Sequence, residues 1–529
     1  MTTTTVEWPG QRPGVLRLAP LALAVASLFA APAALADWRF TPTLRVVETY
    51  TDNVDLRPDD RAHSELISEI TPGFALALDS RRLKGSAHAS YRQFVYAKES
   101  SDRNRSDHFS QYGADLHGVV AEDLLFVDAS ASSGRQSVSA FGPRAEDRPY
   151  SDLNSTQVKT WRISPYLVQQ FGRNARATVR YTRDSVESDR RSQFGDSLAD
   201  TVSASLDSLP DAGKLGWGLN YQHQDLDSER VGETSTENIS GRLRYQLLRT
   251  FALTANAGYD RYDYQTLGGR TAGRNWSAGF SWTPSQRSTV EASLGRHFYG
   301  TTGSLLASVR SRRSVWLLSY SDAITNSRSQ FTLPAAVDTA AMLDRLFLTS
   351  IPDPVQRRQA VEAYIQASGL PPSLADSVNY LSNRYMRQKQ LQASAAFRGL
   401  RSSAVLSAYA NERTALSSQT SDSALLGSQL ASLNNNVRQF GANATATYRL
   451  NGRSSLVGSA TASRTESLTT GRESVQRHLR LGFNTQLGRH LNGSVELRRR
   501  LGDTDFEIGS LATRGYSENA ISATLSMQL

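Results

Sequence analysis

The segment Ala175-Arg176-Ala177-Thr178-Val179-Arg180-Tyr181-Thr182 alternates apolar and polar positions, with small or apolar side chains at the odd numbers and Arg or Thr at the even ones. Successive side chains of a β-strand point to opposite faces of the sheet, so the two kinds of residue form two different faces. Residues at helical spacing would not separate in this way. The segment therefore predicts a strand that borders an apolar environment on one side and a polar one on the other.

The same alternation recurs from Phe40 to Leu529, in segments of about ten residues separated by turns or loops. Further apolar faces are formed by Leu215, Trp217, Leu219 and Tyr221; by Ile239, Gly241, Leu243, Tyr245 and Leu247; by Trp276, Ala278, Phe280 and Trp282; and by Phe440, Ala442, Ala444, Ala446 and Tyr448. From Ile521, every second residue is apolar up to Leu529, which resembles the final strand that the outer-membrane assembly machinery binds. That signal usually closes on an aromatic residue, and here it closes on leucine.

The connections between these segments alternate between short and long. Tight turns at 171–174, 284–287 and 451–453 alternate with longer polar loops, including 135–155 and 411–436. Short periplasmic turns and long external loops produce this rhythm in transmembrane barrels, whereas a soluble β-sandwich shows no such regularity. The sequence predicts an all-β fold, a transmembrane antiparallel up-and-down β-barrel of about 22 strands, in the range of roughly 18 to 24.

The first 36 residues have the pattern of a secretory signal peptide. Arg12 and Arg17 precede an apolar run at 18–29, and Ala34-Leu35-Ala36 offers the small residues that signal peptidase requires. The apolar run is shorter than the about 20 residues that span a membrane. We expect cleavage after Ala36, a mature barrel of residues 37–529, and a location in the outer membrane of a Gram-negative bacterium.

The composition limits the partners of the chain. Hydrophobic residues make up 39% of the 529 residues and there is no cysteine, so neither disulfides nor a lipoprotein anchor is available. The net charge of +9 would suggest nucleic acid in a cytoplasmic protein, but export removes that partner. The expected partners are outer-membrane lipids, anionic lipopolysaccharide and an anionic exported polymer.

Residues 326–383 interrupt the alternation with an insertion of helical character. Asp353 is placed to cap a helix that Pro354 begins and Gly369 ends, and a second helix is expected at 338–347. By strand parity the insertion belongs to an external loop. A lumen enclosed by about 22 strands is wide enough to need partial closure, so inward folding as a constriction is favoured over an external lid.

The charged residues of the polar face are mostly arginines. Those predicted to line the pore are Arg162, Arg176, Arg180, Arg242, Arg244, Arg480 and Arg498. Fixed positive charge favours anions, and guanidinium groups bind carboxylates, phosphates and sulfates through paired donors, while Tyr166 could offer a flat surface to a sugar ring. The alternative is that these arginines pair with acidic residues on neighbouring strands and only hold the wall together.

The apolar face carries two further groups of residues near the outer ends of the strands. The aromatic residues Tyr181, Tyr221, Tyr259 and Phe298 are expected to form a girdle at the lipid interface. The rim arginines Arg183, Arg261, Arg296 and Arg499 would be costly in mid-membrane but tolerable at the outer edge, where lipopolysaccharide phosphates could pair with them.

Enzymatic chemistry finds little support in the sequence. The 8 histidines are scattered and none has the spacing of a metal site or a nucleophile motif, and no phosphate-binding loop is present. His88 and His117 could meet carboxylates across adjacent strands, but solvated histidines of the barrel wall are the better interpretation. We therefore expect no catalytic residues, no metal and no cofactor.

Two stretches resemble a known family. The first is Glu48-Thr49-Tyr50-Thr51-Asp52-Asn53-Val54-Asp55-Leu56, followed by Ile70-Thr71-Pro72-Gly73-Phe74, and the second runs through Tyr299-Gly300, Arg310, Arg312-Arg313, Trp316 and Tyr320. Together with the barrel pattern they resemble the PEP-CTERM system-associated outer-membrane protein family. The resemblance implies membership of an exosortase and exopolysaccharide system, a part in moving polymer across the outer membrane, and periplasmic export proteins as partners.

Three hypotheses for function remain open from the sequence. The preferred one is a non-enzymatic channel that exports an anionic exopolysaccharide, with residues 326–383 as its gate. The alternatives are a passive anion-preferring porin and an outer-membrane enzyme that modifies lipid or polymer. A TonB-dependent receptor is not expected, because no globular plug precedes the first predicted strand.

Overall fold

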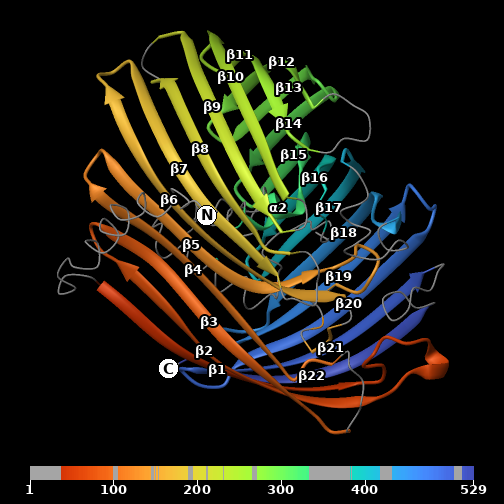
Figure 1. Cartoon of the computed structure of the whole chain (residues 1–529). Coiled ribbons are helices and arrows are strands. Elements are labelled where there is room, and N and C mark those ends of the chain that lie inside the picture. The colour runs from red at the N-terminus through yellow and green to blue at the C-terminus, as the bar shows by residue number, and fades with distance from the viewer. Residues whose placement is uncertain are drawn as a thin grey trace, which may run out of the picture.

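The computed structural model describes residues 37–98, 105–144, 148, 150–152, 154–188, 195–209, 213–229, 232–264, 271–332, 343, 361, 382, 384–417, 432–504 and 515–528. Over these residues, 22 strands form one antiparallel sheet in which β1 pairs with both β2 and β22 (Figure 1). The sheet is therefore a closed barrel. The predicted fold class and number of strands are confirmed.

The strands are β1 (Asp37–Thr51), β2 (Glu65–Asp79), β3 (Leu83–Tyr96), β4 (His108–Ala121), β5 (Leu125–Ser137), β6 (Ser155–Phe171), β7 (Ala175–Ser188), β8 (Ser197–Ser208), β9 (Leu215–Ser228), β10 (Gly232–Leu248), β11 (Phe251–Tyr262), β12 (Ala272–Ser285), β13 (Ser288–His297), β14 (Gly300–Arg310), β15 (Ser314–Thr325), β16 (Met386–Arg398), β17 (Ser402–Ala415), β18 (Asn436–Arg449), β19 (Ser454–Ser467), β20 (Glu473–Gln486), β21 (Leu491–Thr504) and β22 (Tyr516–Gln528). Short helices occur at η3 (Asp59–Arg61) and α2 (Ser327–Thr332). No helix in the described part of the chain is long and apolar enough to cross a membrane.

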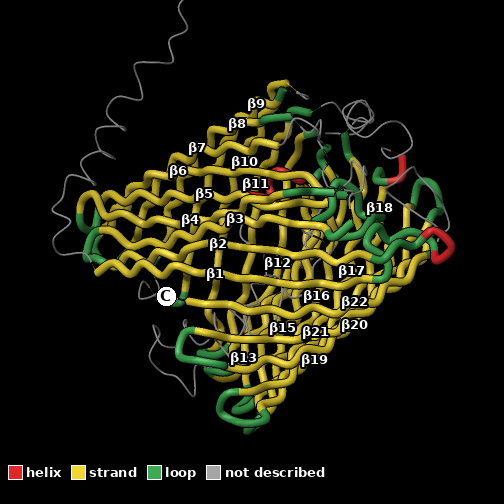
Figure 2. Tube along the Cα trace, turned by 90° about the horizontal axis from the view of Figure 1, so that it is seen from below, coloured by secondary structure: helices red, strands yellow, loops and turns green. Residues whose placement is uncertain are grey.

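Each strand pairs with its neighbours in sequence, and the first and last strands close the ring. The closing register runs from Thr43 opposite Gln528 to Thr51 opposite Ala520. Figure 2 shows the strands side by side around the wall. Closure leaves no free sheet edge, so the backbone groups of the strands find partners within the wall, which a segment surrounded by lipid requires.

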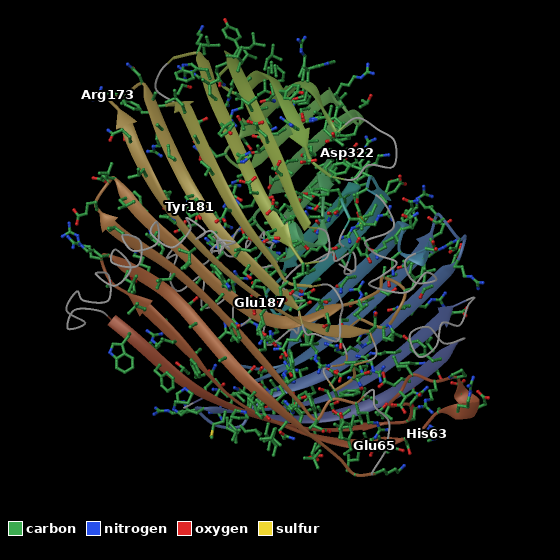
Figure 3. All side chains as sticks on the ribbon, viewed as in Figure 1. His63, Glu65, Arg173, Tyr181, Glu187 and Asp322 are labelled. Atoms are coloured by element: carbon green, nitrogen blue, oxygen red, sulfur yellow. The ribbon has the colours of Figure 1, made fainter. Side chains whose placement is uncertain are left out.

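The two ends of the barrel differ in the length of their connections. Short turns at 172–174, 286–287 and 450–453 lie at the end where β1 begins and β22 finishes, and the long connections 138–154, 326–385 and 416–435 lie at the other. We call these the turn end and the loop end. In Figure 3, Arg173 marks the turn end and Glu187 lies toward the loop end of β7. In outer-membrane barrels the turns face the periplasm and the long loops face outward.

The two faces of the wall have different surroundings. Large apolar side chains are exposed on one face of the strands, for example Ile239 at 53%, Leu243 at 53% and Leu253 at 45%. The opposite face contacts chain segments inside the barrel, as Ser474 and Gln476 of β20 do, and is therefore the inner face. An exposed apolar outer belt on a closed barrel is stable in lipid and not in water, so the barrel spans a membrane.

Parts of the prediction lie outside the described residues. The signal peptide and its cleavage after Ala36 are among them, as are the helices expected at 338–347 and 353–369, with two exceptions. Leu343 and Val361 are described, and both are helical and buried. The helical character of the insertion is observed at these two positions and in α2.

Residues 48–56 and 70–74, which resemble a known family, are called the family-like motif. Gly73 of this motif is placed where any side chain would collide with the wall. A Cβ at this position would lie 2.7 Å from the carbonyl oxygen of Ala89 and 3.0 Å from Oγ1 of Thr43. We expect Gly73→Val to lower the free energy of unfolding by about 1 to 3 kcal/mol, the range typical of overpacking. Urea titration of the barrel in micelles measures this.

The matched control for this change is Gly134→Val in β5. A Cβ at Gly134 would meet no atom within 4 Å, so the same substitution adds no collision there. A loss of stability that is equal at both positions would contradict the steric explanation.

Candidate functional site

All seven arginines predicted to line the pore lie on the inner face of their strands. Four make ion pairs within the wall, with nitrogen to oxygen distances of 2.8 Å for Arg180 and Asp128, 2.9 Å for Arg242 and Asp207, 3.4 Å for Arg480 and Glu496, and 3.1 Å for Arg498 and Glu518. In the strand register Arg162 stands opposite Asp184, Arg176 opposite Asp207, and Arg244 opposite Gly216 and Thr254. Wall pairing thus accounts for four of the arginines, and anion preference stays a prediction.

Four planar side chains stack along the inner wall near the turn end. His117 of β4 lies over Phe126 of β5 at 6.0 Å between ring centroids, and Phe126 lies over Tyr166 of β6 at 5.1 Å. The guanidinium of Arg180 lies 3.9 Å from the centroid of Tyr166. Asp128 accepts a hydrogen bond from Arg180 and contacts Nδ1 of His117 at 2.7 Å. The row presents aromatic and cationic groups to the lumen. His117 meets a carboxylate across strands, the arrangement that the sequence left open beside the favoured solvated histidine.

A first segment crosses the lumen between β5 and β6. The side chain of Ser139 donates a hydrogen bond to Asn434, before β18, at 3.2 Å. On β20, the Ser474 hydroxyl donates to the carbonyl of Phe141 at 3.3 Å, and the Gln476 side chain donates to that of Gly142 at 3.0 Å. In Figure 1 the orange trace after β5 reaches toward β19 and β20. We call residues 139–142 the crossing segment.

The crossing segment is held by an apolar cluster inside the barrel. Phe141 and Ala140 are each 1% exposed and pack with Met386, Leu433 and Val437, which are exposed by 1 to 2%. Such burial is unusual on the inner wall of a wide barrel, where water would otherwise surround the side chains. The crossing segment therefore fills part of the lumen at the loop end.

A second segment crosses from β15 to the opposite wall. Arg328 of α2 pairs with Asp184 of β7 at 2.5 Å and donates to the Ser197 hydroxyl of β8 at 2.9 Å. Arg328 and Asp184 have side chains exposed by only 8% and 6%. The beginning of the 326–383 insertion therefore lies inside the barrel, as the inward prediction requires, and the remainder of the insertion is largely outside the described residues.

Aromatic side chains gather inside the loop end near the second segment. Tyr385 stacks on Tyr264 with ring centroids 4.9 Å apart and meets Tyr262 edge-on at 6.2 Å. Burial raises the pKa of the Tyr264 and Tyr385 phenols above the ordinary value. These side chains remain neutral at physiological pH and pack as largely apolar groups.

The predicted aromatic girdle is placed on the outer face at three of four positions. Tyr221 and Tyr259 are 36% and 44% exposed there, and the Tyr181 hydroxyl donates to Asp200 at 2.5 Å. Phe298 differs, because it lies 5.7 Å from the inward-facing Tyr262. Phe298 follows the last residue of β13, and beyond the end of a strand alternation no longer sets the direction of a side chain.

The predicted rim arginines lie on the outer face, nearer the loop end than the girdle tyrosines of the same strands. Arg183 and Arg261 follow Tyr181 and Tyr259 by two residues, and Arg183 lies 3.9 Å from Asp200. Arg296 and Arg499 are exposed. Pairing of these residues with lipopolysaccharide phosphates stays a prediction.

The family-like motif closes the barrel. Its inward residues reach β22: Thr49 bonds to Ser522 at 2.9 Å and Thr51 donates to Glu518 at 2.9 Å. Asp52 accepts hydrogen bonds from Asn519, and the Asn53 amide donates to the carbonyl of Ser517 at 2.9 Å. Glu48 and Tyr50 are exposed on the outer face. Pro72 has no ladder partner on β3, where it has no N–H to donate, and pairing resumes at Gly73.

Several solved structures can be aligned with this chain at low sequence identity. No family model matches the sequence, and no curated protein matches it. Among solved structures, a mutant ferric enterobactin receptor of Pseudomonas aeruginosa is 11% identical, with 93% of this chain and 80% of that chain aligned and a TM-score of 0.45. The FrpB iron transporter of Neisseria meningitidis is 11% identical, with 92% and 81% aligned and a TM-score of 0.37.

The crossing segment is the part of the site that sequence reasoning missed. Residues 135–155 were expected to be a polar external loop, yet they contain Ala140-Phe141 between polar neighbours. An aromatic residue within a long polar loop is a signal that the loop packs on something. Within the described ranges, no group of three or more His, Asp or Glu side chains is placed to hold a metal ion.

Proposed function

We propose that the chain is an outer-membrane channel that exports an anionic exopolysaccharide and is closed at rest by its two inward segments. The observation that carries this proposal is the attachment of residues 139–142 to β20 and of Arg328 to β7, which occupies the lumen from two sides. A wall of 22 strands encloses more space than that of an open porin, and barrels of this size are typically plugged. Closure favours regulated transport of a large cargo over passive diffusion.

The cargo class is suggested by the stacked row near the turn end. The faces of the Tyr166 ring are covered by Phe126 and Arg180, so the half-buried Tyr166 and Phe126 offer their ring edges to the C–H groups of a sugar, and the Arg180 guanidinium can bind a carboxylate or sulfate. Arg180, Asp128 and His117 have side chains exposed by 28%, 39% and 43%, so the row is accessible from the lumen. An acidic polysaccharide that enters from the periplasm would meet this row first.

The resemblance of the opening motif to the PEP-CTERM system-associated family supports the same cargo class. In that interpretation a periplasmic export protein delivers the polymer to the turn end, and the loop end opens as the polymer arrives. The four hydrogen-bonded motif residues hold β1 against β22. The resemblance therefore suggests the export system to which the barrel belongs, and it does not suggest which residues contact the cargo.

The stacked row gives a testable division of roles between charge and ring surface. We expect Arg180→Gln to weaken binding of an oligogalacturonate by roughly tenfold, since it removes a charge-assisted contact, and to leave an uncharged maltooligosaccharide of equal length within about twofold. Tyr166→Ala should weaken the binding of both oligosaccharides. Isothermal titration calorimetry on the detergent-solubilised barrel measures these affinities.

The control for charge is Arg274→Gln, which removes an exposed arginine from the outer face of β12. It should change neither affinity. Equal binding of both sugars by wild type and Arg180→Gln would remove the support that the row gives to an anionic cargo.

The function itself is tested by deleting the gene and measuring secreted acidic polysaccharide. Export predicts that the polymer disappears from the medium and returns with the wild-type gene. Unchanged secretion, together with conductance of the purified protein in planar bilayers without any partner, would instead identify a passive porin.

A further inference from the structure

The outer face of β17 to β22 contains a groove in the membrane-facing belt. A cavity of about 720 Å³ lies over these strands, and a second of about 360 Å³ shares Ala404, Ala446 and Gly458 with it. The shared residues make the two cavities one continuous furrow. The second cavity reaches Gly399 and Tyr448 next to the turn end, so the furrow runs along the barrel wall toward that end.

The strand register explains the furrow. One row across the strands reads Leu406, Ala444, Ala460, Leu479 and Arg499, and the next row toward the turn end reads Ala404, Ala446, Gly458, Leu481 and Leu497. Small side chains on β18 and β19 form the floor, and leucines on β20 and β21 form one side. Because the small residues are adjacent in space, no large neighbour fills the furrow.

Two unpaired arginines stand at the loop-end edge of the furrow. Arg499 ends the first row, and Arg477 stands opposite Leu501, one row nearer the loop end on the same outer face. Both are exposed, and in the described part of the chain neither makes an ion pair, whereas the nearby Arg464 is paired with Glu473 at 2.5 Å. Asp503, one row further toward the loop end, makes no ion pair with either. The edge therefore carries two available guanidinium groups.

We propose that this furrow binds one phosphorylated glycolipid of the outer leaflet, that is, a lipopolysaccharide molecule. An acyl chain lies in the furrow along the wall, and Arg477 and Arg499 bind the phosphates of the headgroup. Three features select this occupant: the furrow is lined mainly by small and apolar side chains of the outer face, its charged edge is at the loop end, and guanidinium groups bind phosphate through paired donors. The proposal rests on the outer-membrane location proposed above and is independent of the cargo.

The test is native mass spectrometry of the purified barrel in micelles with added diphosphorylated lipid A or with phosphatidylglycerol. Wild type should retain one lipid A and prefer it over phosphatidylglycerol. Arg477→Gln and Arg499→Gln should each lower the affinity by roughly tenfold through loss of a charge-assisted contact. Ala460→Leu should abolish the bound lipid, because its side chain fills the floor of the furrow.

Matched controls lie on another part of the same outer face. Arg274→Gln removes an exposed outer arginine, and Ala278→Leu adds an outward leucine on β12, a strand that contributes no residue to either of the two cavities. Both should bind lipid A as wild type does. Each variant is also run on an SDS gel with and without boiling. Slower migration after boiling shows that the unheated barrel was folded, so loss of binding is separated from loss of the membrane fold.

Three outcomes would overturn the proposal. Wild-type affinity in both arginine variants would mean that the charged edge binds no phosphate. Equal retention of phosphatidylglycerol would mean a groove for any lipid. A dimer that Ala460→Leu converts to a monomer would mean that the furrow is an interface between two copies of the chain.

Discussion

Replacing Phe141 with alanine is expected to raise the open probability of the channel by about a hundredfold. Phe141 is 1% exposed and packs with Met386, Leu433 and Val437, a contact that exists only while the crossing segment is in place. Loss of a buried phenylalanine costs about 3 to 5 kcal/mol, and about 1.4 kcal/mol corresponds to tenfold in an equilibrium constant. Single-channel recording in planar bilayers measures the open probability directly.

The control for this prediction is Phe171→Ala at the turn end. Phe171 is 54% exposed on the outer face and touches none of the residues of the crossing segment's cluster. It should leave the recording unchanged. If Phe141→Ala conducts no more often than wild type, the crossing segment does not close the lumen, and the proposed gating is wrong.

Replacing Glu518 with alanine is expected to lower the free energy of unfolding by about 3 to 5 kcal/mol. Glu518 is fully buried at the seam between β1 and β22, where it pairs with Arg498 at 3.1 Å and Arg500 at 3.2 Å and accepts a hydrogen bond from Thr51. Removing the carboxylate leaves two nearly buried arginines without their shared partner, which is the costly way to break a buried ion pair. Urea unfolding followed by tryptophan fluorescence gives the difference.

Glu518→Gln separates charge from hydrogen bonding at the seam. The amide oxygen can still accept from Thr51, so this variant should lie between wild type and Glu518→Ala. Glu233→Ala, at an exposed position of β10, serves as the control and should change stability by less than about 0.5 kcal/mol. A Glu518→Ala barrel as stable as this control would show that the seam does not depend on the buried carboxylate.

The fold could be predicted because its signal is local. In β7 each step from Ala175 to Thr182 changes the kind of residue, and the same rule holds along most strands without knowledge of any distant contact. Turn positions such as 172–174 are equally local. Strand number and the alternation of short and long connections follow from these signals, and both are confirmed.

The contents of the lumen could not be predicted because they depend on distant parts of the chain. Ser139 bonds to Asn434, which is 295 residues away, and Arg328 meets Asp184, which is 144 residues away. Even ion pairs within the wall skip a strand, as Arg180 of β7 reaches Asp128 of β5 across β6. Pairing of neighbouring strands alone does not identify such partners.

The role of the family-like motif also depends on a distant part of the chain. Its residues are local in sequence, but their role depends on β22, because Thr49, Thr51, Asp52 and Asn53 all bond to residues 517–522. A motif at the start of a barrel can therefore report on how the barrel closes. The class of cargo must instead be inferred from the side chains that line the lumen.

One face of each strand meets lipid, and the other meets water inside a closed barrel. Because the chain has no cysteine, single cysteines can be introduced at 176 to 182 in β7 and labelled in liposomes with a membrane-impermeant thiol reagent. We expect cysteines replacing Arg176, Thr178 and Arg180 to react and those replacing Ala177, Val179 and Tyr181 not to react, whereas position 182, where Thr182 is 6% exposed, is shielded by the wall and the inward segment. Reactivity that repeats every three to four residues, or that is uniform along the strand, would contradict it.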